Sequence, residues 1–251
     1  MRVRAYKKGS DYSYALGVFP TLELLEARPY SVRQVILSSA SSRNEGAAKI
    51  RSICKNLGVD VSVNDTKVES LAKKGNCLAV GVFSKYEMKL RDSAHHVVLV
   101  NPGDMGNLGT ISRTMAAFGV HDLAIISPGV DVFDPKVIRS SMGALFHLEV
   151  EYFDSFETYG SHHQRHMLPF MLQGSHNIRE LKIHENAPYS LIFGNESGGL
   201  PDEYLNMGTP VVIPHSAKVD SLNLAVAVGI ALYELSLRWT SSEGRRSSVK
   251  D

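Results

Sequence analysis

The residues best suited to chemistry lie in two polar loops of the segment 191–230. The first loop, residues 194–199, reads GNESGG, and a polar turn of this kind can bring backbone amides close to a ligand. The second loop follows Pro214 and ends at Ser221-Leu222-Asn223, where a long apolar helix begins. Together the two loops predict a ligand-binding site.

Each loop follows a short apolar run, residues 191–193 and residues 211–213, and both runs are too short for a helix. Two strand–loop–helix units in succession, with polar groups at the strand ends, are how an open parallel sheet builds a ligand crevice. We therefore expect the site at the carboxyl ends of these two strands.

Composition places the chain among soluble globular proteins. It has 251 residues, of which 43% are hydrophobic and 21% are charged, and this length allows one large or two ordinary domains. No apolar run approaches the ~20 residues that span a bilayer, and the basic start MRVRAYKKGS lacks the apolar segment of a secretory signal. Cys54 and Cys77 are too few for a disulfide framework. We expect no membrane association and a reducing, cytoplasmic location.

Charge is divided unevenly along the chain. Residues 1–96 carry 16 Lys and Arg against 9 Asp and Glu, whereas residues 97–251 carry 11 against 17. The basic part suggests an anionic macromolecular partner, although exposed Lys and Arg that only keep a domain soluble would give the same count.

The first part of the chain predicts a compact α/β domain over residues 1–84, followed by a polar linker over 85–96. Gly58 and Gly75 follow two of its predicted helices, where glycine commonly ends a helix. The expected helices are 21–26, 43–57 and 67–74, and the expected strands are 33–37, 59–63 and 78–83.

A second α/β domain is expected over residues 97–240, with a flexible tail over 241–251. Its first helix is expected to follow the loop 101–109 and to end at Phe118. Two further helices are expected at 135–143 and 222–239. Its strands are expected at 97–100, 123–127, 146–152, 167–172, 191–193 and 211–213.

Two familiar nucleotide motifs are absent from the sequence. There is no GxxxxGK[ST], the loop that cradles phosphates with its lysine. The spacing of Gly103, Gly106 and Gly109 also differs from the dinucleotide fingerprint GxGxxG, so a nicotinamide site is not expected.

Three segments together carry a family resemblance. Residues 107–114, NLGTISRT, and residues 194–200, GNESGGL, resemble the first and second motifs of the SpoU (TrmH-type) RNA 2'-O-ribose methyltransferases of the SPOUT superfamily. Ile213-Pro214 followed by SLNLAVA at 221–227 resembles the third. Residues 1–84 also resemble, by pattern alone, the ribosomal-protein-like RNA-binding domain of that family.

The resemblance implies a trefoil-knotted parallel sheet that binds S-adenosylmethionine and transfers its methyl group to a ribose 2'-hydroxyl. Such a knot is an exception to ordinary chain connectivity. The implied reaction needs no metal, because the sulfonium of the donor supplies the driving force. The positions that match the family's cofactor contacts are Gly194, Ile213 and Leu222, with backbone groups near Gln173 and Gly174 added.

The matching catalytic positions are Asn107, Arg113, Glu196, Ser221 and Asn223. A guanidinium stays protonated at neutral pH, so Arg113 is expected to stabilise charge and position the attacking oxygen, and the proton acceptor is left unassigned. Asn107 and Asn223 can orient ribose, Arg113 or cofactor, and Glu196 is expected to hold Asn107 and Arg113.

Simpler interpretations exist for several of these residues. Asn107 alone could cap a helix while Arg113 lies on a solvated face, and Ser221 could be an N-cap. His162, His163 and His166 suggest a metal cluster, but they lack Cys or carboxylate neighbours, so a solvated loop is favoured and no metal is expected.

Two departures from the family pattern are compatible with a cofactor pocket but leave the identity of the RNA substrate open. His215 stands where an apolar residue is usual, and the loop 216–220 is more charged than in relatives.

We therefore predict methylation of structured RNA that depends on S-adenosylmethionine, with ribosomal RNA favoured over transfer RNA because of the dedicated N-terminal domain. The alternatives are a tRNA ribose methyltransferase, a non-catalytic RNA-binding protein that retains the fold, and a small-molecule α/β enzyme.

A homodimer is also predicted. The helix 222–239, LNLAVAVGIALYELSLRW, is apolar or small on nearly every face until Glu234, and such a helix must be covered on both sides. Small residues at Ala225, Ala227, Gly229 and Ala231 are expected to let a partner helix approach closely.

Overall fold

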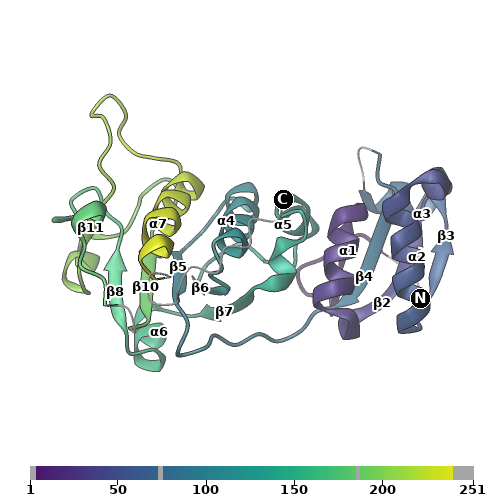
Figure 1. Ribbon diagram of the computed structural model, residues 1–251, viewed down its shortest axis with the longest axis horizontal. Helices are drawn as coiled ribbons and strands as arrows, with labels where there is room; N and C mark the ends of the chain where they lie inside the picture. The colour runs from purple at the N-terminus through teal and green to yellow at the C-terminus, as the bar shows by residue number, and fades with distance from the viewer. Residues whose placement is uncertain (1–3, 73–75, 185–186, 240–251) are drawn as a thin grey trace. The chain divides into compact units, whose positions relative to one another are not determined.

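The computed structural model describes residues 4–72, 76–184 and 187–239, so the predicted tail at 241–251 and Gly75 lie outside the described residues (Figure 1). The chain groups into two compact units. The first consists of Met1–Met88, Met105–Arg113 and Val130–Leu148, and the second of Lys89–Asp104, Thr114–Gly129 and Glu149–Asp251.

The first unit is built on a four-stranded sheet with the order β1-β4-β2-β3. Strand β4 pairs antiparallel with β1 and β2, whereas β2 pairs parallel with β3. The strands are β1 (Tyr12–Leu16), β2 (Val32–Leu37), β3 (Val61–Val63) and β4 (Ala79–Ser84). The helices are α1 (Val18–Ala27), α2 (Glu45–Leu57), α3 (Asp65–Ala72) and α5 (Pro135–Ser140), with 3₁₀ turns η1 (Pro29–Ser31), η2 (Ser39–Arg43) and η3 (Ala144–His147).

Successive side chains of β2 point to opposite faces of the sheet, and both faces are buried. Val35 and Leu37 pack with Leu25 of α1 and Ile50 of α2, whereas Ile36 between them packs on the other face with Val68 of α3. The predicted α/β character of this part of the chain is confirmed.

The second unit is built on a five-stranded, wholly parallel sheet with the order β7-β6-β5-β10-β8. Its three central strands are buried along their whole length, as the continuous apolar runs of parallel strands require. The strands are β5 (His96–Val100), β6 (Asp122–Ile126), β7 (Glu149–Phe153), β8 (His166–Pro169) and β10 (Tyr189–Phe193).

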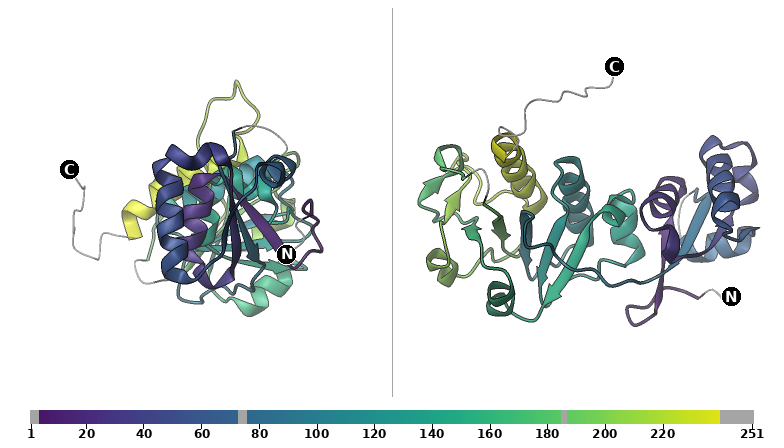
Figure 2. Two further views of the ribbon diagram at one scale, coloured as in Figure 1. Left: turned by 90° about the vertical axis from the view of Figure 1, so that its right-hand side faces the viewer. Right: turned by 60° about the horizontal axis from the view of Figure 1, so that its bottom comes forward.

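Helices α6 (Phe156–His162) and α7 (Leu224–Trp239) lie on opposite faces of this sheet (Figure 2). Helix α4 (Met105–Ala117) follows β5, and Gly229 of α7 lies close to Thr114 near the end of α4. Short elements complete the unit: β9 (His176–Asn177), β11 (Val211–Val212), and the 3₁₀ turns η4 (Ile178–Glu180) and η5 (Asp202–Asn206). The α/β class is confirmed, and the threading of the chain into a knot stays a prediction.

Several expected elements differ from the structure. Residues 144–147 form η3 rather than the start of a strand, so β7 begins at Glu149. The run 211–213 contributes only β11, which pairs with β9 outside the main sheet. No α-helix follows β10 before β11, because Pro201, Gly208 and Pro210 interrupt the segment that contains η5. Strand β1 and helix α6 were not predicted.

The segment expected as a polar linker, residues 85–96, is bonded to the second unit through Leu90 and Arg91. The backbone amide of Arg91 donates to Oδ1 of Asp122 at 2.8 Å, and its guanidinium Nε lies 3.1 Å from Oδ2 of the same carboxylate. The Asp122 side chain is 0% exposed, whereas that of Arg91 is 56% exposed. The Leu90 amide donates to Glu151 in the same way, at 3.0 Å.

A buried hydrogen-bonded chain lies at the start of β5. Nε2 of His96 lies 3.0 Å from the carbonyl oxygen of Arg91, which can only accept, so Nε2 carries the hydrogen. Nδ1 therefore accepts from the Tyr159 hydroxyl at 2.9 Å, and that hydroxyl also bonds Ser190. Burial lowers the pKa of His96 to about 4, with the charge of Arg165 acting in the same direction.

The histidines at 162, 163 and 166 belong to ordered elements rather than to a solvated loop. His162 ends α6, His163 is the C-cap residue that follows it, and His166 begins β8. His163 is buried, with Nδ1 2.7 Å from Asp92. Among the described residues no group of three or more His, Cys, Asp or Glu is placed to hold a metal ion. In the same part of the chain, no helix is both long and apolar enough to cross a bilayer.

Candidate functional site

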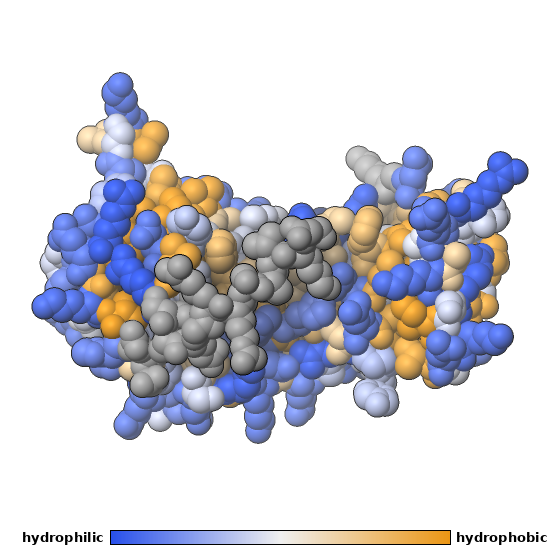
Figure 3. Space-filling view, in the orientation of Figure 1, coloured by the Kyte–Doolittle hydropathy of each residue, from blue (hydrophilic) through white to orange (hydrophobic). Residues whose placement is uncertain are grey.

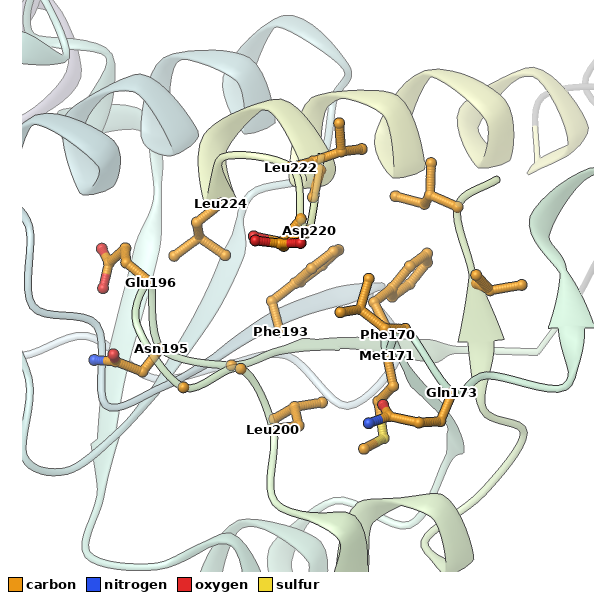
Figure 4. Close-up of a pocket in the computed structure, with 18 of the residues that line it drawn as sticks. Phe170, Met171, Gln173, Phe193, Asn195, Glu196, Leu200, Asp220, Leu222 and Leu224 are labelled. Atoms are coloured by element: carbon orange, nitrogen blue, oxygen red, sulfur yellow. The ribbon is translucent and has the colours of Figure 1, made fainter. Parts of the chain in front are cut away.

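A cavity of about 360 Å³ lies in the second unit at the carboxyl ends of β8 and β10 (Figure 4). Three loop segments line it: residues 170–173 after β8, residues 193–200 after β10, and the connection from β11 into α7. The predicted crevice is therefore present, and both polar loops identified in the sequence contribute to it.

The glycine-rich turn closes tightly on itself. The Asn195 amide donates to the Gly199 carbonyl at 3.2 Å, and the Gly199 amide donates back at 2.9 Å. A Cβ at Gly194 would lie 2.0 Å from the carbonyl carbon of Gly199, so no side chain fits there. Gly199 itself has φ +66°, in the left-handed region. The turn thus presents backbone groups to the cavity.

Side chains of the turn fasten it to the loop after β5. The Asn195 amide nitrogen donates to the carbonyl oxygen of Asn101 at 2.6 Å, while its Oδ1 accepts from the backbone and hydroxyl of Ser197. The Glu196 carboxylate accepts from the amides of Gly103 and Asp104 at 3.1 and 3.2 Å. These two amides come immediately before α4, where backbone N–H groups favour a negative charge.

One wall of the cavity is aromatic. The rings of Phe170 and Phe193 stack with centroids 4.6 Å apart and an interplanar angle of 12°. Leu200, Leu222 and Leu224 add aliphatic surface, and Figure 4 shows these side chains around the same space as the two rings.

The loop from β11 ends at a capped helix. Asn223 Oδ1 accepts from the amide of Ala225 at 2.9 Å and from that of Val226 at 3.3 Å, so Asn223 is the N-cap of α7. The interpretation of Ser221 as the N-cap is wrong, because this role falls two residues later. Ser221 instead lines the cavity.

The structure brings six of the predicted site residues to this cavity. Gln173, Gly194, Ile213, Leu222, Glu196 and Ser221 line it. Gly174 is not among the residues that line it. A Cβ there would lie 2.4 Å from the carbonyl carbon of Val211, so two chain segments meet closely at this glycine.

Three predicted catalytic residues are not among those that line the cavity. Asn223 caps α7, while Asn107 and Arg113 lie on α4. The Asn107 side chain is half-buried and that of Arg113 is exposed. The expected hold of Glu196 on Asn107 and Arg113 stays a prediction, because the contacts described for this carboxylate are with Gly103 and Asp104.

Phe170 and Asp220 are among the cavity residues that sequence reasoning missed. Phe170 was expected inside a strand, but β8 ends at Pro169 and leaves Phe170 free to stack. Asp220 belongs to the charged loop that departs from the family pattern, and this unusual charge was the available signal.

The cavity is acidic. Glu196 and Asp220 supply carboxylates, and no Lys or Arg occurs among the described residues that line it. His215, which also lines it, has Nδ1 2.9 Å from the carbonyl oxygen of Ile213. An apolar, acidic cavity with exposed backbone groups suits a flat ring system attached to a cationic group.

Comparison with known proteins finds relatives that are similar to this chain in sequence and solved structures that are similar to it in fold. An uncharacterized tRNA/rRNA methyltransferase of Synechocystis sp. is 37% identical over 146 residues, covering 55% of this chain and 51% of its own length. The 23S rRNA (uridine(2479)-2'-O)-methyltransferase of Streptomyces viridochromogenes is 31% identical, covering 58% and 53%. The chain thus spans about half the length of these two curated relatives.

Among solved structures, the AdoMet-bound rRNA methyltransferase from Sinorhizobium meliloti is 26% identical, with a TM-score of 0.75 over 91% of this chain and 87% of that one. The model of the SpoU rRNA Methylase family matches residues 94–233, which is more than half of the chain and includes every segment that lines the cavity. The chain therefore belongs to the SpoU rRNA Methylase family.

Proposed function

We propose that the protein transfers a methyl group from S-adenosylmethionine to a ribose 2'-hydroxyl of RNA. The observation that carries this proposal is the convergence of Gln173, Gly194, Ile213 and Leu222 on one cavity at the carboxyl ends of parallel strands. These are the positions at which the family motifs imply cofactor contacts.

The residues of the cavity fit this cofactor. A volume of about 360 Å³ lies in the usual range of small-molecule sites. The wall formed by Phe170, Phe193 and Leu222 suits an adenine ring, and the 194–199 turn offers backbone groups for its polar edge. Two carboxylates suit a ligand that carries net positive charge.

S-adenosylmethionine supplies a methyl group activated by the positive sulfur to which it is bonded. The chain must hold the ribose in line with that methyl group and stabilise the oxygen as its proton leaves. Arg113 is proposed to stabilise this oxygen electrostatically, and Ser221 and Asn223 to position the groups around it. Glu196 is held by the amides of Gly103 and Asp104, so its contribution is to fix the turn to the loop that follows β5.

The substrate is proposed to be structured RNA, with ribosomal RNA ahead of transfer RNA. Support comes from the family description and from the names of the relatives, which include an enzyme acting on 23S rRNA. The excess of Lys and Arg in residues 1–96 agrees with a phosphate-rich partner.

A homodimer is proposed from the surface of α7. Val226, Tyr233 and Leu237 are 50%, 54% and 57% exposed, and together with half-buried Ile230 they form a stripe along one side of the helix. Figure 3 shows hydrophobic residues gathered over α7. The expected role of Ala225 and Ala231 as partner contacts is wrong, because both are buried within their own unit, 7% and 0% exposed.

The test compares Arg113→Ala and Arg113→Lys with the unchanged protein. Methyl transfer should fall on the order of 10²-fold or more in Arg113→Ala, because a preorganised charge near the reacting oxygen is lost. Binding of S-adenosylmethionine, measured by calorimetry, should persist, since Arg113 does not line the cavity.

Ribose methylation is then mapped in RNA from cells with and without the protein. Cofactor binding without any methylated ribose would favour a non-catalytic RNA-binding protein.

A further inference from the structure

The two carboxylates of the cavity differ in their surroundings. Glu196 accepts two hydrogen bonds from the amides of Gly103 and Asp104, which offset its charge. Asp220 makes no hydrogen bond and no ion pair within 4 Å with any residue that the structure describes. Lys218, two residues earlier, is exposed and forms no ion pair with it in this described part of the chain. Asp220 therefore contributes to the cavity a negative charge that no described protein group balances.

The position of Asp220 directs this charge to the middle of the cavity. Figure 4 shows its carboxylate between Glu196 at one end and Gln173 at the other, on the side where Leu222 and Leu224 lie. Phe193, Leu222 and Leu224 line the same space and cannot form an ion pair or a conventional hydrogen bond with the carboxylate through their side chains. A cationic ligand in the cavity would be its natural counter-charge.

The methyl donor and the product differ in charge. S-adenosylmethionine carries a sulfonium, an ammonium and a carboxylate, so its net charge is +1, whereas the thioether product S-adenosylhomocysteine is neutral overall. We propose that Asp220 is a specificity-determining residue that favours the cationic donor over the neutral product. This inference rests on the proposed function and adds the residue that distinguishes the two ligands.

The expected effect is moderate because the Asp220 side chain is exposed to solvent. In Asp220→Asn, which keeps the shape and removes the charge, affinity for S-adenosylmethionine should fall on the order of fivefold. Affinity for S-adenosylhomocysteine should stay nearly unchanged. Preference for the donor in the unchanged protein should also decrease at high salt, since salt screens exposed charges.

The experiment is a calorimetric titration of the full chain with each of the two ligands. Asp220→Glu should retain the preference, and Asp202→Asn should leave it unchanged, because Asp202 is an exposed carboxylate of η5 that does not line the cavity. Equal affinity losses for both ligands in Asp220→Asn, or no loss for either, would overturn the inference while leaving the proposed function intact. If neither ligand bound the unchanged protein, the proposed function would fail and the inference with it.

Discussion

The side-chain amide of Asn195 donates a 2.6 Å hydrogen bond to the backbone carbonyl of Asn101 and so connects the loops that follow two neighbouring strands, β10 and β5. Asn101 has φ +53°, a conformation that asparagine adopts more readily than most residues. The bond fixes the glycine-rich turn against the rest of the second unit.

Replacing Asn195 by Asp should therefore weaken ligand binding. The substitution removes the donor and sets a carboxylate oxygen against the Asn101 carbonyl, so the turn must shift. We expect about tenfold weaker S-adenosylmethionine binding by calorimetry, which corresponds to about 1.4 kcal/mol. Asn206→Asp, at an exposed position of η5, serves as the control. Unaltered affinity in Asn195→Asp would show that the turn is held by its other contacts.

The pair formed by Arg91 and Asp122 should contribute strongly to the stability of the second unit. Asp122→Asn leaves an acceptor for the Arg91 amide but removes the charge that the guanidinium contacts, and we expect a loss of about 2 kcal/mol in the free energy of unfolding. Urea unfolding followed by circular dichroism measures it. Asp11→Asn is the matched control, since Asp11 pairs with Arg33 but is 78% exposed, and should change stability little.

The buried His96 should make stability depend on pH below neutrality. Its pKa is lowered to about 4 from an ordinary value of 6.5, so between these values the unfolded chain binds more protons than the folded chain. The contribution of His96 to stability is therefore full well above pH 6.5 and declines as the pH falls, by about 1 kcal/mol between pH 6.5 and 5.5. Burial also lowers the pKa of the neighbouring His95 to about 4, so His95 adds a decline of its own in the same direction.

Urea unfolding at pH 7.5, 6.5 and 5.5 tests this. His96→Asn should be less stable throughout but should show a smaller decline, whereas His176→Asn should keep the decline, because the His176 ring is exposed. An identical pH dependence in His96→Asn and the unchanged protein would contradict the assignment.

The exposed apolar stripe of α7 should hold two copies of the chain together. Sedimentation equilibrium should give twice the 27.6 kDa chain mass, and Tyr233→Glu combined with Leu237→Glu should give the single mass with loss of methyl transfer. Val63→Glu is a matched control, since Val63 is also 57% exposed but lies in β3 of the first unit. An unchanged protein that is monomeric at micromolar concentration yet methylates RNA would rule out the dimer.

Local sequence signals predicted most strands of the fold and the two loops of the cavity. The buried runs of β5, β6 and β10 are recognisable because each is continuous and apolar, and glycine or asparagine follows β5 and β10. The order of the strands within the sheet, by contrast, cannot be read from the residues of any one strand. Nothing in the sequence around β10 shows that it lies between β5 and β8, or that β11 pairs with β9 outside the five-stranded sheet.

The errors in the predicted site also arise because three-dimensional arrangement is not encoded in local sequence patterns. Ser221 and Asn223 are equally good N-cap types two residues apart, and only the backbone path assigns the cap to Asn223. The small side chains of Ala225 and Ala231 suggested an interface, but their direction around α7 places them in the core. Phe170 was unrecognised because its partner, Phe193, lies on another strand.

The closure of the turn at Gly194 has a consequence for how freely the sequence can vary. A library of all single substitutions, selected for folded protein, should lose every replacement at Gly194, where a Cβ would strike Gly199, and most at Gly199, where φ is +66°. At Gly198 a Cβ would meet nothing within 4 Å and φ is ordinary, so many residues should survive there. Backbone geometry therefore requires glycine at Gly194 and favours it at Gly199. At Gly198, only contact with a ligand in the cavity would select for glycine.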